Sequence, residues 1–254
     1  MASRLPLFPL GTVLFPGLVL PLHIFEDRYR ELVRYLMALP DGTPREFGVV
    51  AIRRGWETQP AGPREQSAGP GEQPAGSGDH PAASGEQPPG EAALILHEVG
   101  CTAELRQVTE HPDGRYDIVT VGRRRFRIAG IDGRAAPYLT ADVEWLPEPP
   151  GEQETADRLA PRVLAMFRHY LALLRPEAAD IAEQLPEDAT VLSHLIAATA
   201  ALSIDDRQRL LAAADTATRL RAELRLLSRE AALLRRVRAV PVPLAELASP
   251  SSPN

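Results

Sequence analysis

The pattern of apolar and polar positions changes character near residue 150. Before that point, apolar residues fall in short runs separated by glycine and proline turn signals, as is typical of β-strands. After it, alanine, leucine and arginine dominate, and the apolar spacing lengthens to that of helices. The pattern therefore predicts an α+β fold with a β-rich part at 1–150, a helical bundle at 151–240 and a flexible tail at 241–254.

The β-rich part contains one segment with helical spacing, over 26–39, and several short extended segments. Asp113 and Gly114 lie between two of these segments, and Asp-Gly supplies the positive φ angles that a tight hairpin connection needs. The predicted extended segments are 12–15, 18–24, 47–53, 101–108, 115–121, 123–131 and 138–145. Short strands of this kind, with turns between them, predict a small antiparallel barrel or curled sheet.

The helical part divides into five predicted helices, at 155–174, 176–184, 189–201, 204–213 and 216–238. Pro176 suits the first position of a helix, because its missing N–H would have no intrahelical partner there. Ser203 with Asp206 resembles a capping box, with Asp where Glu or Gln is usual. Pro241 and Pro243 end the last helix.

The segment 58–90 is rich in proline and glycine and has almost no large apolar residue. Such a segment cannot bury enough surface to offset the entropy of ordering it. Because strand-like sequence lies on both sides, we interpret it as a disordered insertion within the β-rich part. It would serve either as a passive spacer or as a regulatory tether.

The apolar opening at 5–25 resembles a signal peptide or a membrane span only superficially, since it contains Pro6, Pro9, Pro16 and Pro21. Proline inside a helix removes a donor and clashes with the preceding turn. Cys101 is the single cysteine, so no intramolecular disulfide can form, which fits a cytosolic setting. We therefore expect a soluble cytoplasmic protein with no membrane partner.

Lysine is absent, and all 28 Lys+Arg positions are arginine. This excludes a Schiff-base lysine, a P-loop lysine and a Ser-Lys dyad, because guanidinium cannot be deprotonated to replace an amine. None of the six histidines lies in a His-Glu-x-x-His motif. We expect no catalytic residue, no metal and no cofactor, so the sequence predicts a protein that is not an enzyme. An unrecognised hydrolase would need a pocket with an acid or base of shifted pKa.

Arginines gather on the predicted strand at 123–131. Strand alternation predicts that Phe126 and Ile128 point inward and that Arg123, Arg125 and Arg127 line the outer face. That face could meet an anion, an acidic partner or an RNA backbone, or it could be a solvated face with carboxylate neighbours. The net charge of −6 gives no general electrostatic case for nucleic acid.

Several separated motifs carry a family resemblance. The opening LPLFPLGTVLFPGLVLPLHIFEDRYRELV, then FGVVAIRRG, VGCTAELRQV, PDGRYDIVTVGRRRFRI and PYLTADVEWLPE, resemble the Lon amino-terminal domain in that order. The helical part matches more weakly, through LSIDDRQRLLAAADTATRLRAELRLLSRE. The likeness is greatest to small bacterial proteins that consist of this domain alone. It implies a PUA-like pseudo-barrel followed by a helical bundle, and the insertion at 58–90 departs from the family pattern.

The resemblance also implies a function. In Lon, this domain helps to capture unfolded or tagged polypeptides, while attached ATPase and peptidase domains do the chemistry. The resemblance does not extend to those domains. We therefore expect a non-catalytic module that binds exposed apolar polypeptide, as an adaptor or modulator in proteolysis or protein quality control, with a protease or chaperone as a possible partner. The alternative is an RNA-binding PUA-like module that uses the strand Arg123 to Arg127.

No individual contact residue for polypeptide follows from the resemblance, because the shared motifs look like fold-forming positions. Phe8, Phe15, Phe25 and Tyr29 are expected in the core rather than on a binding surface.

Overall fold

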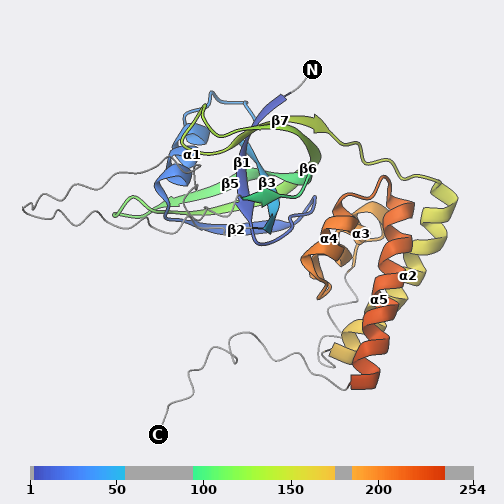
Figure 1. Cartoon of the computed structure of the whole chain (residues 1–254). Helices are drawn as coiled ribbons and strands as arrows, with labels where there is room; N and C mark the ends of the chain where they lie inside the picture. Colours follow the sequence, from blue (N-terminus) through green and yellow to red (C-terminus); the bar gives the residue numbers. More distant parts are fainter. Residues whose placement is uncertain (1–2, 55–93, 175–184, 238–254) are drawn as a thin grey trace, which may run out of the picture.

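The computed structural model describes residues 3–54, 94–174 and 185–237. In chain order the elements are β1 (Ser3–Leu10), β2 (Val19–Ile24), α1 (Asp27–Met37), β3 (Glu46–Arg54), β4 (Ile95–Leu96), β5 (Val99–Glu110), β6 (Tyr116–Asp132), β7 (Thr140–Trp145), α2 (Gln153–Leu174), α3 (Ala189–Thr199), α4 (Ile204–Leu211) and α5 (Thr216–Val237). The strands and α1 form a barrel-like unit, and α2 to α5 form a bundle beside it (Figure 1). The predicted α+β class is confirmed. The insertion at 58–90, the helix at 176–184 and the tail at 241–254 lie outside the described residues.

The strands close into a ring in the order β1, β7, β6, β5, β3, and β1 then pairs with β3. This last pair is parallel, with Leu7 opposite Gly48, whereas the other pairs are antiparallel. The predicted small antiparallel barrel matches the other pairs, and the parallel pair of β1 with β3 is a feature that the sequence did not predict. Parallel neighbours need a crossover connection, and the chain supplies one by passing through β2 and α1 between β1 and β3.

β6 is one long strand with two partners along one edge. Its first half, from Tyr116 to Val121, pairs with β2, and its second half, from Phe126 to Asp132, pairs with β7. Gly122 lies where the partner changes, and a Cβ atom there would lie only 2.1 Å from the carbonyl oxygen of Phe15. The sequence predicted two strands at 115–121 and 123–131, because glycine usually marks an interruption. Here Gly122 is needed for a close approach of backbone.

The amino terminus differs from the sequence prediction in two places. No strand was predicted at β1, although Pro6 and Pro9 argued against a helix there, and the strand accommodates both prolines while changing partner from β7 to β3 at its midpoint. The segment 12–15 was predicted to be extended, but it forms no strand. Its residues Val13, Leu14 and Phe15 are buried all the same, so the apolar run reflects packing against the core rather than strand pairing.

α1 covers one end of the barrel with its buried side chains Tyr29, Leu32, Val33 and Leu36. The ring of Tyr29 stacks on Phe8, with 3.9 Å between their centroids. The expectation of a core position is confirmed for Phe8, Phe15 and Tyr29. It was wrong for Phe25, which is 52% exposed. Phe25 follows the buried Ile24 in the alternation of β2 and therefore points outward.

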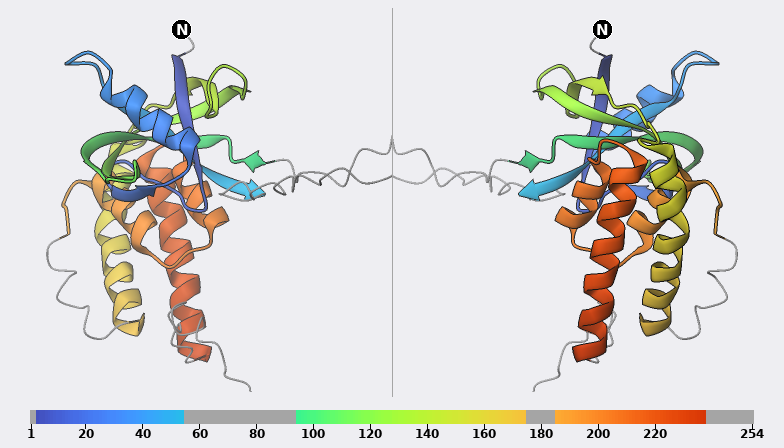
Figure 2. Two further views of the ribbon diagram at one scale, coloured as in Figure 1. Left: turned by 90° about the vertical axis from the view of Figure 1, so that its left-hand side faces the viewer. Right: turned by 90° about the vertical axis from the view of Figure 1, so that its right-hand side faces the viewer.

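The helices form a core of their own and also complete the core of the barrel. α2 and α5 pack along each other (Figure 2), and Phe167, Tyr170, Leu220 and Leu227 are among the side chains buried between the helices. α4 packs against the barrel, where Leu210 and Leu211 join the barrel core and Gln208 Nε2 donates to Val99 O at 2.6 Å. The predicted cap of α4 is confirmed, since the backbone N–H of Asp206 donates to Ser203 Oγ at 3.1 Å.

None of the helices in the described ranges combines the length and the apolar character that crossing a membrane requires.

Candidate functional site

An apolar strip lies on the outside of the barrel, where β2 pairs with the first half of β6. Val19 is opposite Val121 and Pro21 is opposite Val119, and side chains of directly opposed residues share one face of a sheet. Val19 is 62% exposed, Pro21 is exposed, and the two β6 valines are partly exposed. Phe25 continues the same alternation beyond the end of β2. We call Val19, Pro21, Phe25, Val119 and Val121 the β2 face.

The residues of β2 that alternate with this face are apolar as well, but they point inward. Leu20 and Leu22 pack against the barrel core, and Ile24 is buried within it. Among the described residues, β2 pairs with β6 alone, so its other edge has no strand partner. Pro21 fits such a position, because proline within a sheet is largely confined to edge strands. The β2 face therefore combines exposed apolar side chains with an open strand edge.

Charged and polar groups lie at both ends of the β2 face. At one end, His23 Nδ1 lies 2.6 Å from Asp117 Oδ1, and His111 Nε2 lies 2.7 Å from Asp117 Oδ2. At the other end, Glu104 is opposite Val121 on β5, and its carboxylate pairs with Arg123 at 2.8 Å. An apolar strip with a polar rim is the usual anatomy of a protein interaction surface.

The structure separates the three arginines that the sequence placed on one face. Arg123 and Arg127 are exposed, whereas Arg125 is only 2% exposed, so the prediction of an outward Arg125 was wrong. The neighbouring Arg124 pairs with Glu46 at 3.2 Å and lies over the ring of Trp145, with 3.9 Å from Cζ to the centroid. The outer face of β6 is thus partly neutralised, and it lacks Arg125 altogether.

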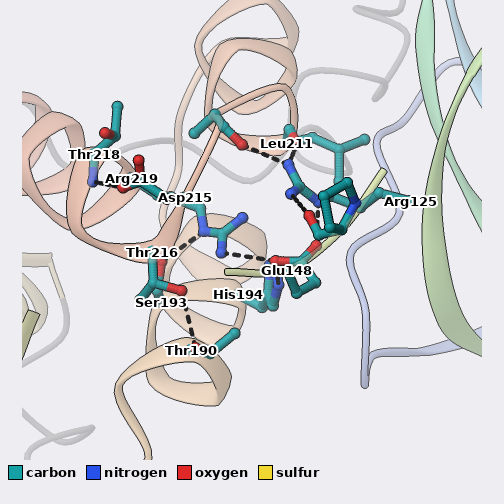
Figure 3. Close-up of polar contacts among 12 residues, drawn as sticks. Arg125, Glu148, Thr190, Ser193, His194, Leu211, Asp215, Thr216, Thr218 and Arg219 are labelled. Atoms are coloured by element: carbon teal, nitrogen blue, oxygen red, sulfur yellow. Dashed lines mark hydrogen bonds and ion pairs between the residues drawn. The ribbon is translucent and has the colours of Figure 1, made fainter. Parts of the chain in front are cut away.

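Arg125 connects the barrel to the helical bundle (Figure 3). Its Nη1 donates to the carbonyl oxygen of Leu211, the last residue of α4, at 2.7 Å and to that of Ala213, just beyond the helix, at 2.6 Å. Its Nη2 donates to Pro147 O at 2.7 Å, and its Nε pairs with the carboxylate of Glu148. A planar guanidinium can satisfy acceptors in several directions at once, which an ammonium group on a flexible stem does less well. One side chain therefore joins β6, the 146–152 connection and the end of α4.

Glu148 links this contact to the centre of the bundle. Its Oε2 lies 3.2 Å from Arg219 Nη2 and 3.4 Å from His194 Nε2. Arg219 Nε donates to Ser193 Oγ, and Ser193 Oγ donates to Glu223 Oε1, each at 2.8 Å. Figure 3 shows Glu148 between Arg125 and Arg219. We call Arg125, Glu148, Ser193, His194, Arg219 and Glu223 the joint network.

Within the joint network, the pKa values of Glu148 and His194 are lowered and the pKa of Glu223 is raised. Burial alone would raise the pKa of Glu148, but the adjacent His194 ring and the guanidinium groups of Arg219 and Arg125 hold it at about 2. Burial raises the pKa of Glu223 to about 8, against the opposing effects of its hydrogen bond from Ser193 and of Arg219. Burial also lowers the pKa of His194. Arg125 and Glu148 lie between barrel and bundle, and the other members lie within the bundle, so the network connects the two parts.

The described residues offer little support for nucleophilic chemistry. Cys101 is fully buried and burial raises the pKa of its thiol, which agrees with a structural role. A cavity of about 450 Å³ lies against the first half of α2 and the start of α3. Among the described residues, its lining contains no histidine or cysteine and consists largely of Ala, Pro, Leu, Thr and carboxylate side chains.

Sequence reasoning missed the β2 face and most of the joint network. The signal for the β2 face was present, since Val19, Pro21, His23 and Phe25 occupy alternate positions of an extended segment. The segment was treated as one apolar run because the inward positions are apolar as well. No comparable signal marked Glu148, which stands between Pro147 and Pro149 in a segment without periodicity.

Comparison with known proteins identifies the fold and the family. Residues 4–229 match the family described as the ATP-dependent protease La (LON) substrate-binding domain. The N-terminal domain of the Mycobacterium avium complex Lon protease superposes with a TM-score of 0.59 at 18% identity, covering 89% of this chain and 98% of that one. The Lon N-terminal domain protein from Xanthomonas campestris gives a TM-score of 0.52 at 22% identity with the same coverage.

Among curated relatives, Lon protease 2 of Herpetosiphon aurantiacus is 36% identical over 139 residues, which is 53% of this chain and 17% of that protein. Lon protease 2 of Syntrophobacter fumaroxidans is 26% identical over 221 residues, which is 85% of this chain and 23% of that protein. The chain thus spans about a fifth of the length of these relatives. From the match over most of its length, the chain belongs to the Lon substrate-binding domain family.

Proposed function

We propose that this chain is a non-catalytic module that binds exposed apolar polypeptide segments, and that the β2 face is its binding surface. The observation that carries the proposal is the exposure of Val19 and Phe25 beside the open edge of β2, in a chain of the Lon substrate-binding family. A contiguous apolar strip of this kind is costly to leave in water unless a partner covers it.

The geometry favours an extended segment as the bound partner. A polypeptide that lies along β2 can place alternate side chains against Val19, Pro21 and Val121. Pro21 has no N–H, so it removes one donor from β2, and we expect side-chain contacts rather than a full backbone ladder to supply most of the affinity. Such recognition depends on apolar character and tolerates many sequences, which suits a module that captures unfolded chains.

We further propose that the chain acts as an adaptor or modulator in proteolysis or protein quality control, in the cytoplasm, with a protease or chaperone as a partner. The support is the family's description as the substrate-binding domain of an ATP-dependent protease, and the relatives it matches are Lon proteases several times as long as the matched region. The joint network supports the same view, because it fixes the barrel on the bundle and so presents the β2 face from a rigid body.

Substitution of Val19 by aspartate tests the binding surface. We expect V19D to weaken the affinity for a fluorescein-labelled, permanently unfolded polypeptide by about tenfold or more, because a carboxylate would have to lose its hydration at the contact. Fluorescence anisotropy of purified protein measures the dissociation constant. The matched control is V191D, since Val191 is also an exposed valine, 52% exposed at the start of α3. Equal affinities for V19D and wild type, or equal losses in V19D and V191D, would contradict the proposal.

The RNA-binding alternative remains a prediction, and the geometry weakens its basis. Arg125 is enclosed in the joint network, while Arg123 and Arg124 pair with carboxylates. The same anisotropy assay with a short RNA at low and physiological salt distinguishes the two functions. Binding to phosphates falls steeply as salt rises, whereas apolar contacts with polypeptide are largely insensitive to it.

A further inference from the structure

His23, His111 and Asp117 form a cluster that comes from three different segments of the chain. His23 is on β2 and lies directly opposite Asp117 on β6. His111 is in the connection between β5 and β6, where Gly114 N donates to His111 O at 2.9 Å and His111 N donates to Arg115 O at 2.8 Å. The strand pairing and the hairpin turn therefore fix all three side chains relative to one another.

The polar atoms of these three side chains lie close together. One ring nitrogen from each histidine and one carboxylate oxygen all lie within 4.8 Å of one another. The two histidine rings meet nearly edge to face, with 6.1 Å between their centroids. Groups that each bond to a metal at about 2.0–2.2 Å must lie within roughly 4 Å of one another, so only a small movement of exposed side chains would be needed.

We propose that His23, His111 and Asp117 form a binding site for a divalent transition-metal ion, with Zn²⁺ as the best match. Two imidazole nitrogens and one carboxylate oxygen suit zinc and its neighbours, whereas Mg²⁺ and Ca²⁺ prefer oxygen ligands throughout. Three protein ligands leave at least one position for water or for a group on a partner. This inference does not depend on the proposed polypeptide binding.

The surrounding charges are compatible with a cation at this place. Arg115 is held by Asp113 at 2.6 Å, on the other side of the hairpin turn. Arg30, whose guanidinium approaches Gly114, pairs with Asp27 at 2.8 Å. With neutral imidazoles the three proposed ligands carry one negative charge, so a divalent ion leaves the site with a single positive charge. Each neutral imidazole would offer the lone pair of its unprotonated nitrogen to the metal and would carry its single proton on the other ring nitrogen.

A bound ion would tie the end of β2 to the β5–β6 hairpin beside the β2 face. Binding to the folded state alone raises the melting temperature, and we expect a rise of about 3 °C or more when free zinc exceeds its dissociation constant by about 100-fold. Protons compete with a metal for imidazole and carboxylate ligand atoms, so binding should weaken in acid.

The experiment is isothermal titration calorimetry of the full chain with ZnCl₂, and with MgCl₂ as the negative control. Wild-type protein should bind about one zinc ion per chain, and H23Q, H111Q and D117N should each weaken binding by at least about tenfold, since even loss of a group that supports a metal ligand costs roughly 10- to 100-fold. All three positions are exposed or partly exposed, so the folded structure should survive, as circular dichroism can verify.

H169Q is the matched control, because His169 lies on α2 and contacts Arg235 at 2.6 Å instead. Zinc binding that persists unchanged in H23Q and H111Q would overturn the proposal. So would the same loss in H169Q as in the site variants, or the absence of any zinc binding to the wild type at millimolar concentration. Substitution with Co²⁺ gives a second readout, since visible absorption bands that vanish in H23Q report imidazole in the coordination sphere.

Discussion

Replacement of Arg125 by alanine is expected to lower the free energy of unfolding by about 3–5 kcal/mol, the usual cost of removing one partner from a buried charged pair. Arg125 is almost fully buried, and it satisfies three carbonyl oxygens as well as Glu148. Removal of the guanidinium leaves these acceptors without a donor and creates a cavity between the barrel and the bundle. Chemical denaturation monitored by circular dichroism measures the change.

The control for this substitution is R127A on the same strand. Arg127 is exposed, so its replacement should change the free energy of unfolding by no more than about 0.5 kcal/mol. If R125A were as stable as R127A, Arg125 would not hold the two parts of the molecule together.

The number of unfolding steps in the same experiment is a second result. If the two parts unfold in separate steps in R125A but together in wild type, the joint network is what couples them.

Glu223 should make the protein less stable as the pH rises from about 5 to 8. Burial raises its pKa from an ordinary value of 4.5 to about 8, so the folded state holds a proton that the unfolded state has released. The stability that this proton contributes is fully present below the pKa of the unfolded state and is lost as the pH rises through the folded pKa. At about 1.4 kcal/mol per pKa unit, the loss over this range is on the order of 2–4 kcal/mol.

E223Q tests this pH dependence, because glutamine keeps the shape and cannot ionise. We expect the variant to lose most of the decline, so that it gains on wild type between about pH 5 and 8. E230Q is the matched control on the same helix, since Glu230 pairs with Arg229 near the surface and should leave the slope unchanged. Denaturation midpoints measured across this pH range would contradict the account if wild type and E223Q declined in parallel.

The sequence predicted the fold well where one face of an element meets the core and the other meets water. Tyr29, Leu32, Val33 and Leu36 are spaced for a helix, and α1 buries these four side chains. The boundaries of α2 to α5 likewise follow apolar spacing to within a few residues. The sequence did not predict β1, nor the parallel pairing of β1 with β3, which local sequence does not determine.

Arg125 shows why the candidate site was harder to predict. Alternation along a strand assigns one face to the core and the other to solvent, so Arg125 and Phe126 should differ in burial. Both are buried, because the end of α4 covers the outer face of β6 at this position. The pattern within one strand cannot reveal that the end of a helix 86 residues later packs on its outside, as the contact between Arg125 and Leu211 shows.

The β2 face and the histidine cluster illustrate two other reasons. Val19 is about as apolar as Leu20, which packs partly buried against the core, so composition alone could not say which of the two faces solvent. His23 and Asp117 are 94 positions apart, and no spacing rule for metal ligands connects them. Only the register of β2 on β6 brings them together. Sites of this kind depend on tertiary structure and have no short motif.

Hydrogen–deuterium exchange of the full chain, with and without a saturating, permanently unfolded polypeptide, tests the central claim most directly. The account predicts slower exchange of the backbone amides of β2 and of the first half of β6, while exchange in α3 stays unchanged. Protection confined to the cavity between α2 and α3, or saturable binding with no change in β2, would contradict it and move the polypeptide-binding surface elsewhere on the molecule.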